Sequence, residues 1–239
     1  MLTNVFSCVV KAMKTLLVLL PVTLFLFPGD AAAAMKIQKG DTFTGYGFNV
    51  TTQSYAEWRS DLMLTNSAMF LNTPAAPGGI QITNYMQRGM YSPADVVQTS
   101  HAVNGQRTQS LSAANRFNYS HSVDPGWGFL ISRGLAKINV NGWQPINTGE
   151  AIVSGTRSLS SELWSSIQYS DDGEYMKAAG INGISGYVKT ADVNKLLNFE
   201  DPSEMLAYAK EHEGTEYIDV YDESKINVVD KHPVTIEIK

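Results

Sequence analysis

The feature that most constrains how this chain can fold is an apolar run of 13 residues near its N-terminus, Thr15 to Phe27. Lys14 precedes the run, and a Pro-Gly-Asp sequence followed by four alanines closes it. A basic start, an apolar run and a small-residue exit are the pattern of a secretory signal peptide. A membrane-spanning helix needs about 20 apolar residues, and this run is shorter and interrupted by Pro21. The sequence therefore predicts that residues 1–34 are a signal peptide and that the protein is secreted.

Two details of the leader bear on the rest of the chain. Met13-Lys14 is by itself a normal signal-peptide opening, so we favour Met13 over Met1 as the start of translation. The only cysteine, Cys8, lies inside the predicted leader. An exported chain without cysteine forms no disulfide, so its core alone must stabilise it. The same absence excludes a cysteine nucleophile and a thiolate metal site.

Size and charge set further limits on the mature chain. Removal of residues 1–34 leaves 205 residues, enough for one sizeable domain or two small ones. These carry 16 basic and 22 acidic residues, a net charge near −6 that gives no reason to expect a nucleic acid as partner. No later stretch is long and apolar enough to cross a bilayer, so we expect no transmembrane anchor after processing.

Residues 35–155 have the pattern of a β domain. Thr42 to Thr52 alternates partly between apolar and polar residues, as a half-buried strand does. Ser54 to Phe70 fits either a helical period or two strands, and we favour strands. A turn rich in proline and glycine follows at Thr73 to Gly79, before a strand that begins at Ile80.

Two Asn-Gly pairs predict hairpins in the same region. Asn104-Gly105 and Asn141-Gly142 both offer the positive φ that a type I′ turn requires, and the second pair lies between clear apolar runs. Many short strands with turns at this spacing favour an antiparallel β-sandwich.

The chain changes character after the β domain. Residues 156–179 are polar and serine-rich, which predicts a linker or a short helix, and Gly180 to Val193 predicts a turn and a short strand. Asp201, Pro202 and Glu204 form the start signal of a helix that Gly214 ends. Three short strands are expected after it, at 217–221, 226–229 and 234–238. The fold class is thus mainly β, an antiparallel β-sandwich with a small C-terminal α+β segment at residues 180–239.

The C-terminal segment also resembles a known group of proteins. GINGISGYVKTADVN and EDPSEMLAYAKEHEGTEYIDVYDESKINVV are similar to the end of a group of uncharacterised secreted proteins from Gram-positive bacteria. TPAAPGG, MQRGMY and GFLISRGLAKINVNGW are similar to that group's β domain, so the resemblance covers about the last 170 residues. The group has no assigned activity, so the resemblance implies a compartment and a fold but no chemistry. Asp230-Lys231-His232-Pro233 departs from the pattern and leaves the pairing of Val234 to Ile238 open. A Gly-Tyr-Val strand also gives a weaker likeness to bacterial SH3-like wall-binding modules.

No motif in the sequence assigns a catalytic residue. The four histidines are His101, His121, His212 and His232, and no Gly-x-Ser-x-Gly elbow marks a serine nucleophile for any of them. The run Tyr119 to Asp124 brings Ser, His and Asp together, but it has the composition of a polar loop.

Metal and cofactor patterns are equally weak. The histidines lack the short spacing of zinc ligands, and the acidic cluster at 171–174 lacks the alternating oxygens of a calcium loop. No phosphate-cradling glycine loop is present. Glu57, Asp61 and Glu150 are candidates for the carboxylate pair of a glycosidase, which the fold would have to bring together. We therefore expect no metal and no cofactor.

Aromatic residues give the remaining indication of function. Trp127 and Trp143 flank the later hairpin, and amphipathic rings of this kind line wet binding faces for sugars or peptides. The other interpretation, which we favour, is that both rings fill the core of the sandwich. Trp127 and Trp143 are the candidate binding residues if such a face exists.

These observations lead to two hypotheses of function. The first is a secreted, non-enzymatic β-rich protein with a binding or structural role at or near the bacterial cell surface, its partner a cell-wall or extracellular glycan or a protein. The second is a secreted hydrolase acting on peptide or glycan with dispersed catalytic residues.

Overall fold

A computed structural model describes residues 34–59, 62–89, 95–118, 128–154, 173–197 and 201–239. The predicted leader up to residue 33 lies outside these ranges. The elements in the described ranges are β1 (Ala34–Gly45), β2 (Phe48–Trp58), β3 (Leu62–Ala75), β4 (Ile80–Gly89), β5 (Asp95–Val103), β6 (Thr108–Asn118), β7 (Phe129–Asn139), β8 (Trp143–Ser154), β9 (Tyr175–Ala179), β10 (Ser185–Lys189), α3 (Thr190–Leu197), α4 (Pro202–Glu211), β11 (Gly214–Tyr221) and β12 (Val228–Ile238).

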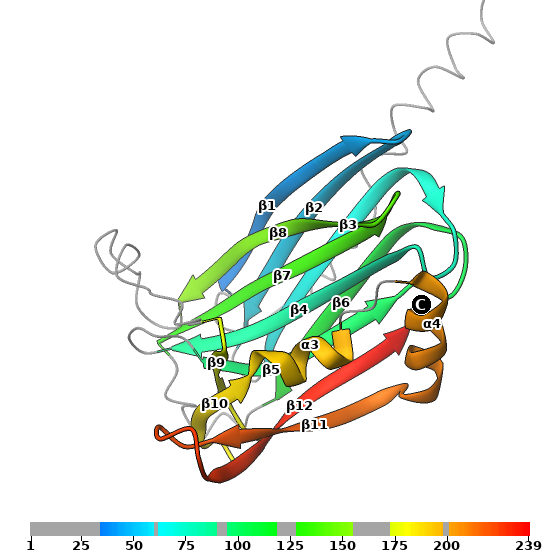
Figure 1. The fold of residues 1–239 in the computed structure, drawn as a ribbon. Coiled ribbons are helices and arrows are strands. Elements are labelled where there is room, and N and C mark those ends of the chain that lie inside the picture. The colour runs from blue at the N-terminus through cyan, green and yellow to red at the C-terminus, as the bar shows by residue number, and fades with distance from the viewer. Residues whose placement is uncertain (1–33, 60–61, 90–94, 119–127, 155–172, 198–200) are drawn as a thin grey trace, which may run out of the picture. The chain divides into compact units, whose positions relative to one another are not determined.

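The strands form two sheets that pack face to face (Figure 1). One sheet has four strands in the order β1-β2-β3-β6, and the other has eight in the order β12-β11-β10-β9-β5-β4-β7-β8. The four-stranded sheet packs against β8, β7, β4 and β5 of the larger one. The predicted fold class is confirmed: the chain is mainly β, with antiparallel sheets in a sandwich and a small helical segment near its C-terminus.

Strand β5 joins the sandwich to the C-terminal strands. One edge of β5 pairs with β4, and the other edge pairs with β9 at Val96 and with β12 along Thr99 to Val103. Strands β9 to β12 also pair with one another in sequence, so these four and β5 complete a closed circuit of hydrogen-bonded strands. The eight-stranded sheet is therefore continuous between residues 35–155 and residues 180–239.

Two local signals in the sequence, the Asn141-Gly142 turn and the Asp201 cap, are confirmed. Asn141 and Gly142 both have positive φ, 66° and 102°, and join β7 to β8 as a hairpin. Asp201 caps α4 by accepting hydrogen bonds from the backbone N–H groups of the second and third residues after it. The helix buries Met205 and Ala209 against β5 and β12. Ser54 to Phe70 lies in two strands, β2 and β3, as expected.

Two predictions for the β domain are wrong. Thr42 to Thr52 is not one strand, because Tyr46 and Gly47 adopt positive φ and turn the chain from β1 into β2. Asn104-Gly105 is not a hairpin turn, because β5 and β6 belong to different sheets. The Asn104 side chain is buried and bonds the N–H of Ile80 and the carbonyl of Ala76, which fixes the crossing between the sheets.

The C-terminal segment also differs from expectation. Val228 to Ile238 is one strand, so the predicted break at residues 230–233 is wrong. Pro233 lies opposite Tyr217 of β11 in this strand, and pairing of β12 with β5 begins at the next residue, Val234. Tyr175 to Ala179, at the end of the predicted linker, forms β9, and residues 156–172 lie outside the described ranges. Helix α3 was not predicted.

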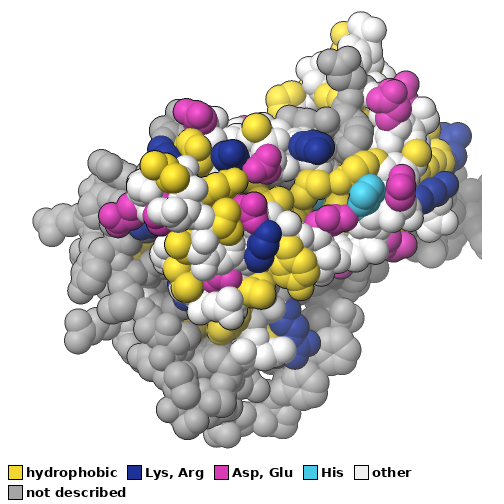
Figure 2. All heavy atoms as spheres, turned by 60° about the horizontal axis from the view of Figure 1, so that its bottom comes forward, with side chains coloured by type: hydrophobic (Ala, Val, Ile, Leu, Met, Phe, Trp, Pro, Cys, Tyr) yellow, Lys and Arg dark blue, Asp and Glu magenta, His cyan; other side chains and the backbone are white. Residues whose placement is uncertain are grey.

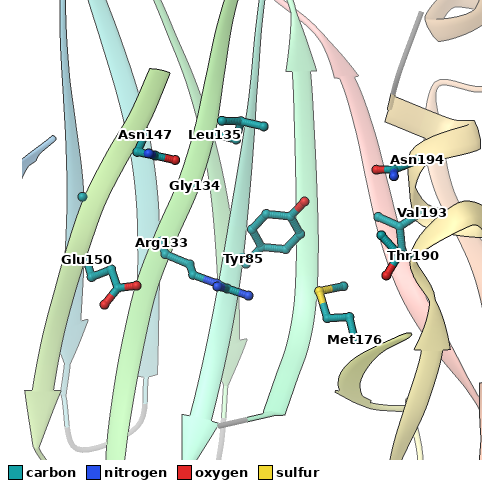
Figure 3. Close-up of a pocket in the computed structure, with 11 residues that line it drawn as sticks. Tyr85, Arg133, Gly134, Leu135, Asn147, Glu150, Met176, Thr190, Val193 and Asn194 are labelled. Carbon is teal, nitrogen blue, oxygen red and sulfur yellow. The ribbon is translucent and has the colours of Figure 1, made fainter. Parts of the chain in front are cut away.

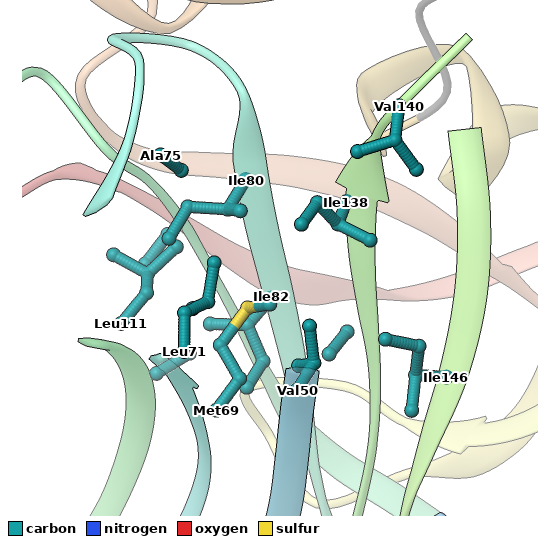
Figure 4. Close-up of a cluster of buried hydrophobic side chains, with 13 residues drawn as sticks. Val50, Met69, Leu71, Ala75, Ile80, Ile82, Leu111, Ile138, Val140 and Ile146 are labelled. Atoms are coloured by element: carbon teal, nitrogen blue, oxygen red, sulfur yellow. The ribbon is translucent and has the colours of Figure 1, made fainter. Parts of the chain in front are cut away.

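The core of the sandwich consists of two apolar clusters with polar side chains between them. The larger cluster contains Ile80, Ile82 and Ile138 and faces β2, β3 and β6 (Figure 4). The smaller one lies toward the other end of the strands and contains Met63, Met86 and Leu130. Burial of side chains of this size stabilises the fold by roughly 1.5–3 kcal/mol each.

Candidate functional site

A belt of buried polar side chains crosses the sandwich between the two apolar clusters. Asn84 of β4 is at its centre and is fully buried. Its Nδ2 donates to the hydroxyls of Ser67 and Ser132, each at 2.9 Å, and its Oδ1 accepts from Thr65 at 2.7 Å and from Asn115 at 2.8 Å. Each hydrogen-bonding position of the amide is therefore used.

The belt continues to both sides of Asn84. The hydroxyls of Ser54 and Thr148 lie 2.7 Å apart, and that of Ser67 lies 3.1 Å from Thr148. Ser100 donates to Asn115 at 2.6 Å. Strands from both sheets thus meet through directional bonds, which fix their relative register more tightly than apolar contacts do.

The outer face of the same strands carries a cleft directly behind the belt. Because side chains alternate along a strand, Tyr85 follows Asn84 and Arg133 follows Ser132 on the opposite face. The cleft has a volume of about 290 Å³ and lies between β4, β7 and β8 on one side and α3 and β9 on the other (Figure 3). Its lining residues are Tyr85, Arg133, Gly134, Leu135, Asn147, Gly149, Glu150, Met176, Thr190, Val193 and Asn194.

A β-bulge shapes the wall of the cleft on β7 and β8. The register shifts between the pairs Arg133–Glu150 and Leu135–Asn147, so β8 contains one extra residue there. Gly149 makes the bulge possible with a φ of 79°, and a side chain there would meet the backbone of Lys39. The bulge brings Arg133 and Glu150 opposite each other on the outer face.

Charge in the cleft is balanced. The Arg133 guanidinium carbon lies 5.7 Å from the centre of the Tyr85 ring, a cation–π contact. Glu150 is the register partner of Arg133 and lies on its other side (Figure 3). Asn147 donates to the carboxylate of Asp41 at 3.2 Å. One cation and one anion among the lining residues make the cleft suited to a ligand without net charge.

The opposite wall combines polar and apolar groups on α3. Thr190 and Asn194 are four residues apart and so lie on one face of the helix, with Val193 beside them. Val193 and the neighbouring Met176 are buried. The Thr190 hydroxyl oxygen is also buried, and it has no hydrogen-bond partner in the part of the chain that the structure describes.

Trp143, one of the two predicted binding residues, does not line this cleft. Trp143 is half-buried at the start of β8 and is not among the lining residues, and its Nε1 has no hydrogen-bond partner in the described ranges. Trp127 lies outside the described residues. The signal that could have found the cleft was a charged residue, Arg133, in the middle of an apolar strand, with Glu150 on the returning strand.

Two of the histidines are buried and uncharged. His232 lies between Thr99 Oγ1 and the Ala179 carbonyl, 3.0 Å from each, and burial lowers its pKa to about 4. His101 lies 2.9 Å from Thr83 Oγ1, and burial, with a smaller contribution from Lys137, lowers its pKa to about 3. Neither histidine is among the residues that line the cleft.

The other histidines give no catalytic arrangement in the described residues. His212 is half-buried, 2.7 Å from Glu216, and stacks on Tyr208 with ring centres 4.0 Å apart. His121, and with it the run Tyr119 to Asp124, lies outside the described ranges.

The candidate carboxylates lie in different places. Glu57 of β2 accepts hydrogen bonds from Tyr55 at 2.5 Å and from Arg59 at 2.6 Å, within its own sheet. Glu150 lines the cleft. Asp61 and residues 171–172 lie outside the described ranges. Within those ranges no group of three or more His, Cys, Asp or Glu residues is placed to hold a metal ion.

A second aromatic surface lies on the C-terminal strands. Tyr175, Tyr187 and Tyr221 come from β9, β10 and β11, and Lys225 lies 4.4 Å and 5.2 Å from the first two ring centres. Lys189 lies 4.9 Å from the Tyr221 ring, and a hydrogen bond with Tyr221 raises the pKa of this lysine. Figure 2 shows this end of the molecule, with hydrophobic side chains mixed among lysines and carboxylates. None of these three tyrosines is among the residues that line the cleft, where polar side chains converge on a cavity, so the cleft is the stronger candidate site.

Comparison with known proteins finds no family model that matches the chain, no curated protein similar in sequence and no solved structure similar in fold. Among the described helices, neither is long and apolar enough to cross a membrane.

Proposed function

We propose that this is a secreted, non-enzymatic protein that binds glycan at or near the bacterial cell surface, through the cleft between the outer sheet face and α3. One observation carries the proposal. Tyr85, Arg133, Glu150, Thr190 and Asn194 converge from three strands and a helix on a cleft of about 290 Å³. That volume is at the lower end of the roughly 300–1,000 Å³ that ligand pockets occupy, so it suits one segment of a polymer.

The chemistry of the lining favours a sugar over other polar ligands. Sugar hydroxyl groups both donate and accept hydrogen bonds, and the lining offers a guanidinium, a carboxylate, two amides and two hydroxyls. Leu135, Met176 and Val193 supply apolar contact for the carbon faces of a ring. The balanced charge gives no advantage to a polyanion.

Export is part of the same proposal. Its support is the leader pattern of residues 1–34 together with the start of β1 at Ala34, so that cleavage after this residue would leave the first strand essentially complete. Residues 32–239 also form one compact unit by themselves. The resemblance to secreted proteins of Gram-positive bacteria points to the same compartment. Mass spectrometry of the culture medium tests this step, and we expect a mature N-terminus at Ala34 or Met35.

The hydrolase hypothesis has less support from the cleft. A glycosidase of the usual kind places two carboxyl groups on either side of the scissile bond. Glu150 is the only carboxylate among the described lining residues, and no histidine is among them. The groups present are those that hold a ligand, which is why we propose binding.

Co-sedimentation with insoluble polysaccharides tests the proposal. Mature protein is mixed with peptidoglycan, chitin or cellulose, and the bound fraction and any released reducing ends are measured. We expect binding without release of sugar. Glu150→Gln should weaken binding about tenfold by removing charge-assisted hydrogen bonds to the ligand.

Glu213→Gln is the matched control, since Glu213 is exposed and lies outside the cleft. This variant should bind like the parent protein. Binding to none of the polysaccharides, or equal binding by Glu150→Gln and the parent, would contradict the proposal. Release of reducing ends that Glu150→Gln abolishes would establish the hydrolase instead.

A further inference from the structure

The α3 wall of the cleft carries a polar pair next to an apolar surface. Thr190 and Asn194 present a hydroxyl and an amide one helical turn apart, and Val193 and Met176 lie next to them (Figure 3). All four side chains line the cleft, and the two apolar ones are more than nine-tenths buried. A bound group at this wall therefore meets hydrogen-bonding atoms and apolar atoms within the same few ångströms.

The Thr190 hydroxyl is the strongest sign that something binds there. Its oxygen is buried and has no hydrogen-bond partner among the described residues, although a threonine at the start of a helix commonly bonds a backbone N–H. Buried polar atoms in folded proteins are nearly always satisfied by protein, water or ligand. A ligand that bonds this hydroxyl removes the penalty of leaving it unpaired.

We propose that the glycan bound in this cleft carries an acetamido group, and that α3 recognises that group. The inference rests on the proposed glycan-binding function and names its ligand class. An acetamido group has a carbonyl acceptor, an N–H donor and a methyl group in one plane. The Thr190 hydroxyl donates to the carbonyl, Asn194 Oδ1 accepts from the N–H, and Met176 and Val193 contact the methyl group.

A plain sugar hydroxyl does not match the wall in the same way. It can bond Thr190 or Asn194, but it places a polar group against Met176 and Val193, where its remaining hydrogen-bonding capacity is lost. Arg133 and Glu150 line the sheet side of the cleft, which faces the ring hydroxyls that both kinds of sugar share. We therefore assign discrimination between an acetamido sugar and a plain sugar to α3. The affinity that both sugars share is assigned to the sheet.

Titration calorimetry with three soluble trisaccharides tests this inference. Chitotriose, its fully deacetylated form and cellotriose share one linkage and differ in the substituent at the second ring carbon. We expect chitotriose to bind at least about tenfold more tightly than cellotriose, because it gains one matched hydrogen bond and one methyl contact. The deacetylated trisaccharide should bind no better than cellotriose.

Variants of Thr190 separate recognition from folding. Thr190→Val keeps the shape and removes the hydroxyl, so it should lower the affinity for chitotriose about tenfold and that for cellotriose by much less, which removes the preference between the two. Thr190→Ser keeps a hydroxyl and should retain the preference. Asn194 is exposed, so Asn194→Ala leaves the fold intact and provides a second variant that should lose more affinity for chitotriose than for cellotriose.

The outcomes distinguish this inference from the proposed function. If no trisaccharide binds, the glycan-binding function fails and the inference fails with it. If cellotriose binds as tightly as chitotriose, or Thr190→Val weakens both alike, recognition of the acetamido group is wrong and glycan binding stands. An N-acetylated dipeptide amide supplies the same group without a sugar, and its binding in place of chitotriose would reassign the cleft to peptide.

Discussion

Asn84 shows how a single residue connects the interior of the sandwich to its surface. Its side chain forms the centre of the buried polar belt, and the next residue, Tyr85, lines the cleft. Ser132 and Arg133 repeat this arrangement on β7. The belt therefore positions the cleft residues by fixing the strands that carry them.

Replacement of Asn84 by alanine should destabilise the protein strongly. The change removes the bonds to Ser67, Ser132, Thr65 and Asn115 and leaves these partners buried without it. We expect the free energy of unfolding, measured by urea denaturation, to fall by about 3–5 kcal/mol. Asn118→Ala, at an exposed position of β6, is the control and should change it by less than about 0.5 kcal/mol. Similar losses for both variants would contradict the role of the belt.

His232 should make the protein less stable in acid. Its pKa is lowered from 6.5 to about 4 in the folded protein, so between these pH values the unfolded chain binds the proton and the folded protein does not. The contribution of His232 to the free energy of unfolding is therefore fully present at neutral pH and is lost as the pH falls. From this group alone, the free energy of unfolding should decrease by about 3 kcal/mol. Urea denaturation between pH 7 and pH 4 measures the effect.

The variant His232→Gln isolates this contribution, because glutamine does not titrate. We expect it to be less stable than the parent at pH 7 but to lose less stability on acidification. An equal pH dependence in the two proteins would show that His232 is not buried in its neutral form. His101, with a pKa lowered to about 3, adds a dependence of the same sign that both proteins share.

At the scale of single elements, the sequence predicts best what backbone chemistry decides locally. The Asn141-Gly142 turn and the Asp201 cap could be predicted because each depends on residues within one turn of the chain. The Tyr46-Gly47 turn was missed because tyrosine rarely adopts a φ of 53°. The hairpin predicted at Asn104-Gly105 is wrong because this dipeptide lies where the chain crosses from one sheet to the other. Hydrogen bonds of the Asn104 side chain hold that crossing.

Gly142 provides a test of an element boundary. Its φ is 102° and a methyl group there would meet no other atom, so Gly142→Ala changes backbone conformational energy alone. We expect it to lower the free energy of unfolding by about 1–2 kcal/mol, measured by urea denaturation. Asn141→Gly is the matched control, because glycine also accepts positive φ, and it should leave stability nearly unchanged. If Gly142→Ala had the same free energy of unfolding as the parent protein, the assigned turn would be wrong.

At the scale of the whole molecule, the C-terminal strands belong to the same sheet as the sandwich. Strand β5 pairs with β4, β9 and β12, so it contributes to both parts. Sequence patterns predicted the mainly β class and the C-terminal helix α4, since these follow from local periodicity and turns. They could not predict that β5 is shared, because strand pairing between residues so far apart in the sequence leaves no local pattern.

The candidate site was beyond sequence reasoning for the same reason. Arg133 and Glu150 lie opposite each other beside a bulge in the hairpin. Thr190 and Asn194 line the same cleft only because α3, which lies far away in the sequence, forms its other wall. The type of the Trp143 side chain suits binding, but this residue does not line the cleft. Residue type and local spacing identify candidate binding residues. Only the pairing of distant strands decides which of these residues lie together in the folded protein.

The most direct test of the proposed site is nuclear magnetic resonance of the mature, ¹⁵N-labelled protein titrated with chitotriose. Glycan binding in the cleft predicts that the largest changes in amide chemical shift fall on residues 133–135, 147–150 and 190–194 and on Met176, with Tyr187 and Tyr221 unaffected. Changes centred on Tyr187 and Tyr221, or no changes at saturating sugar, would contradict it.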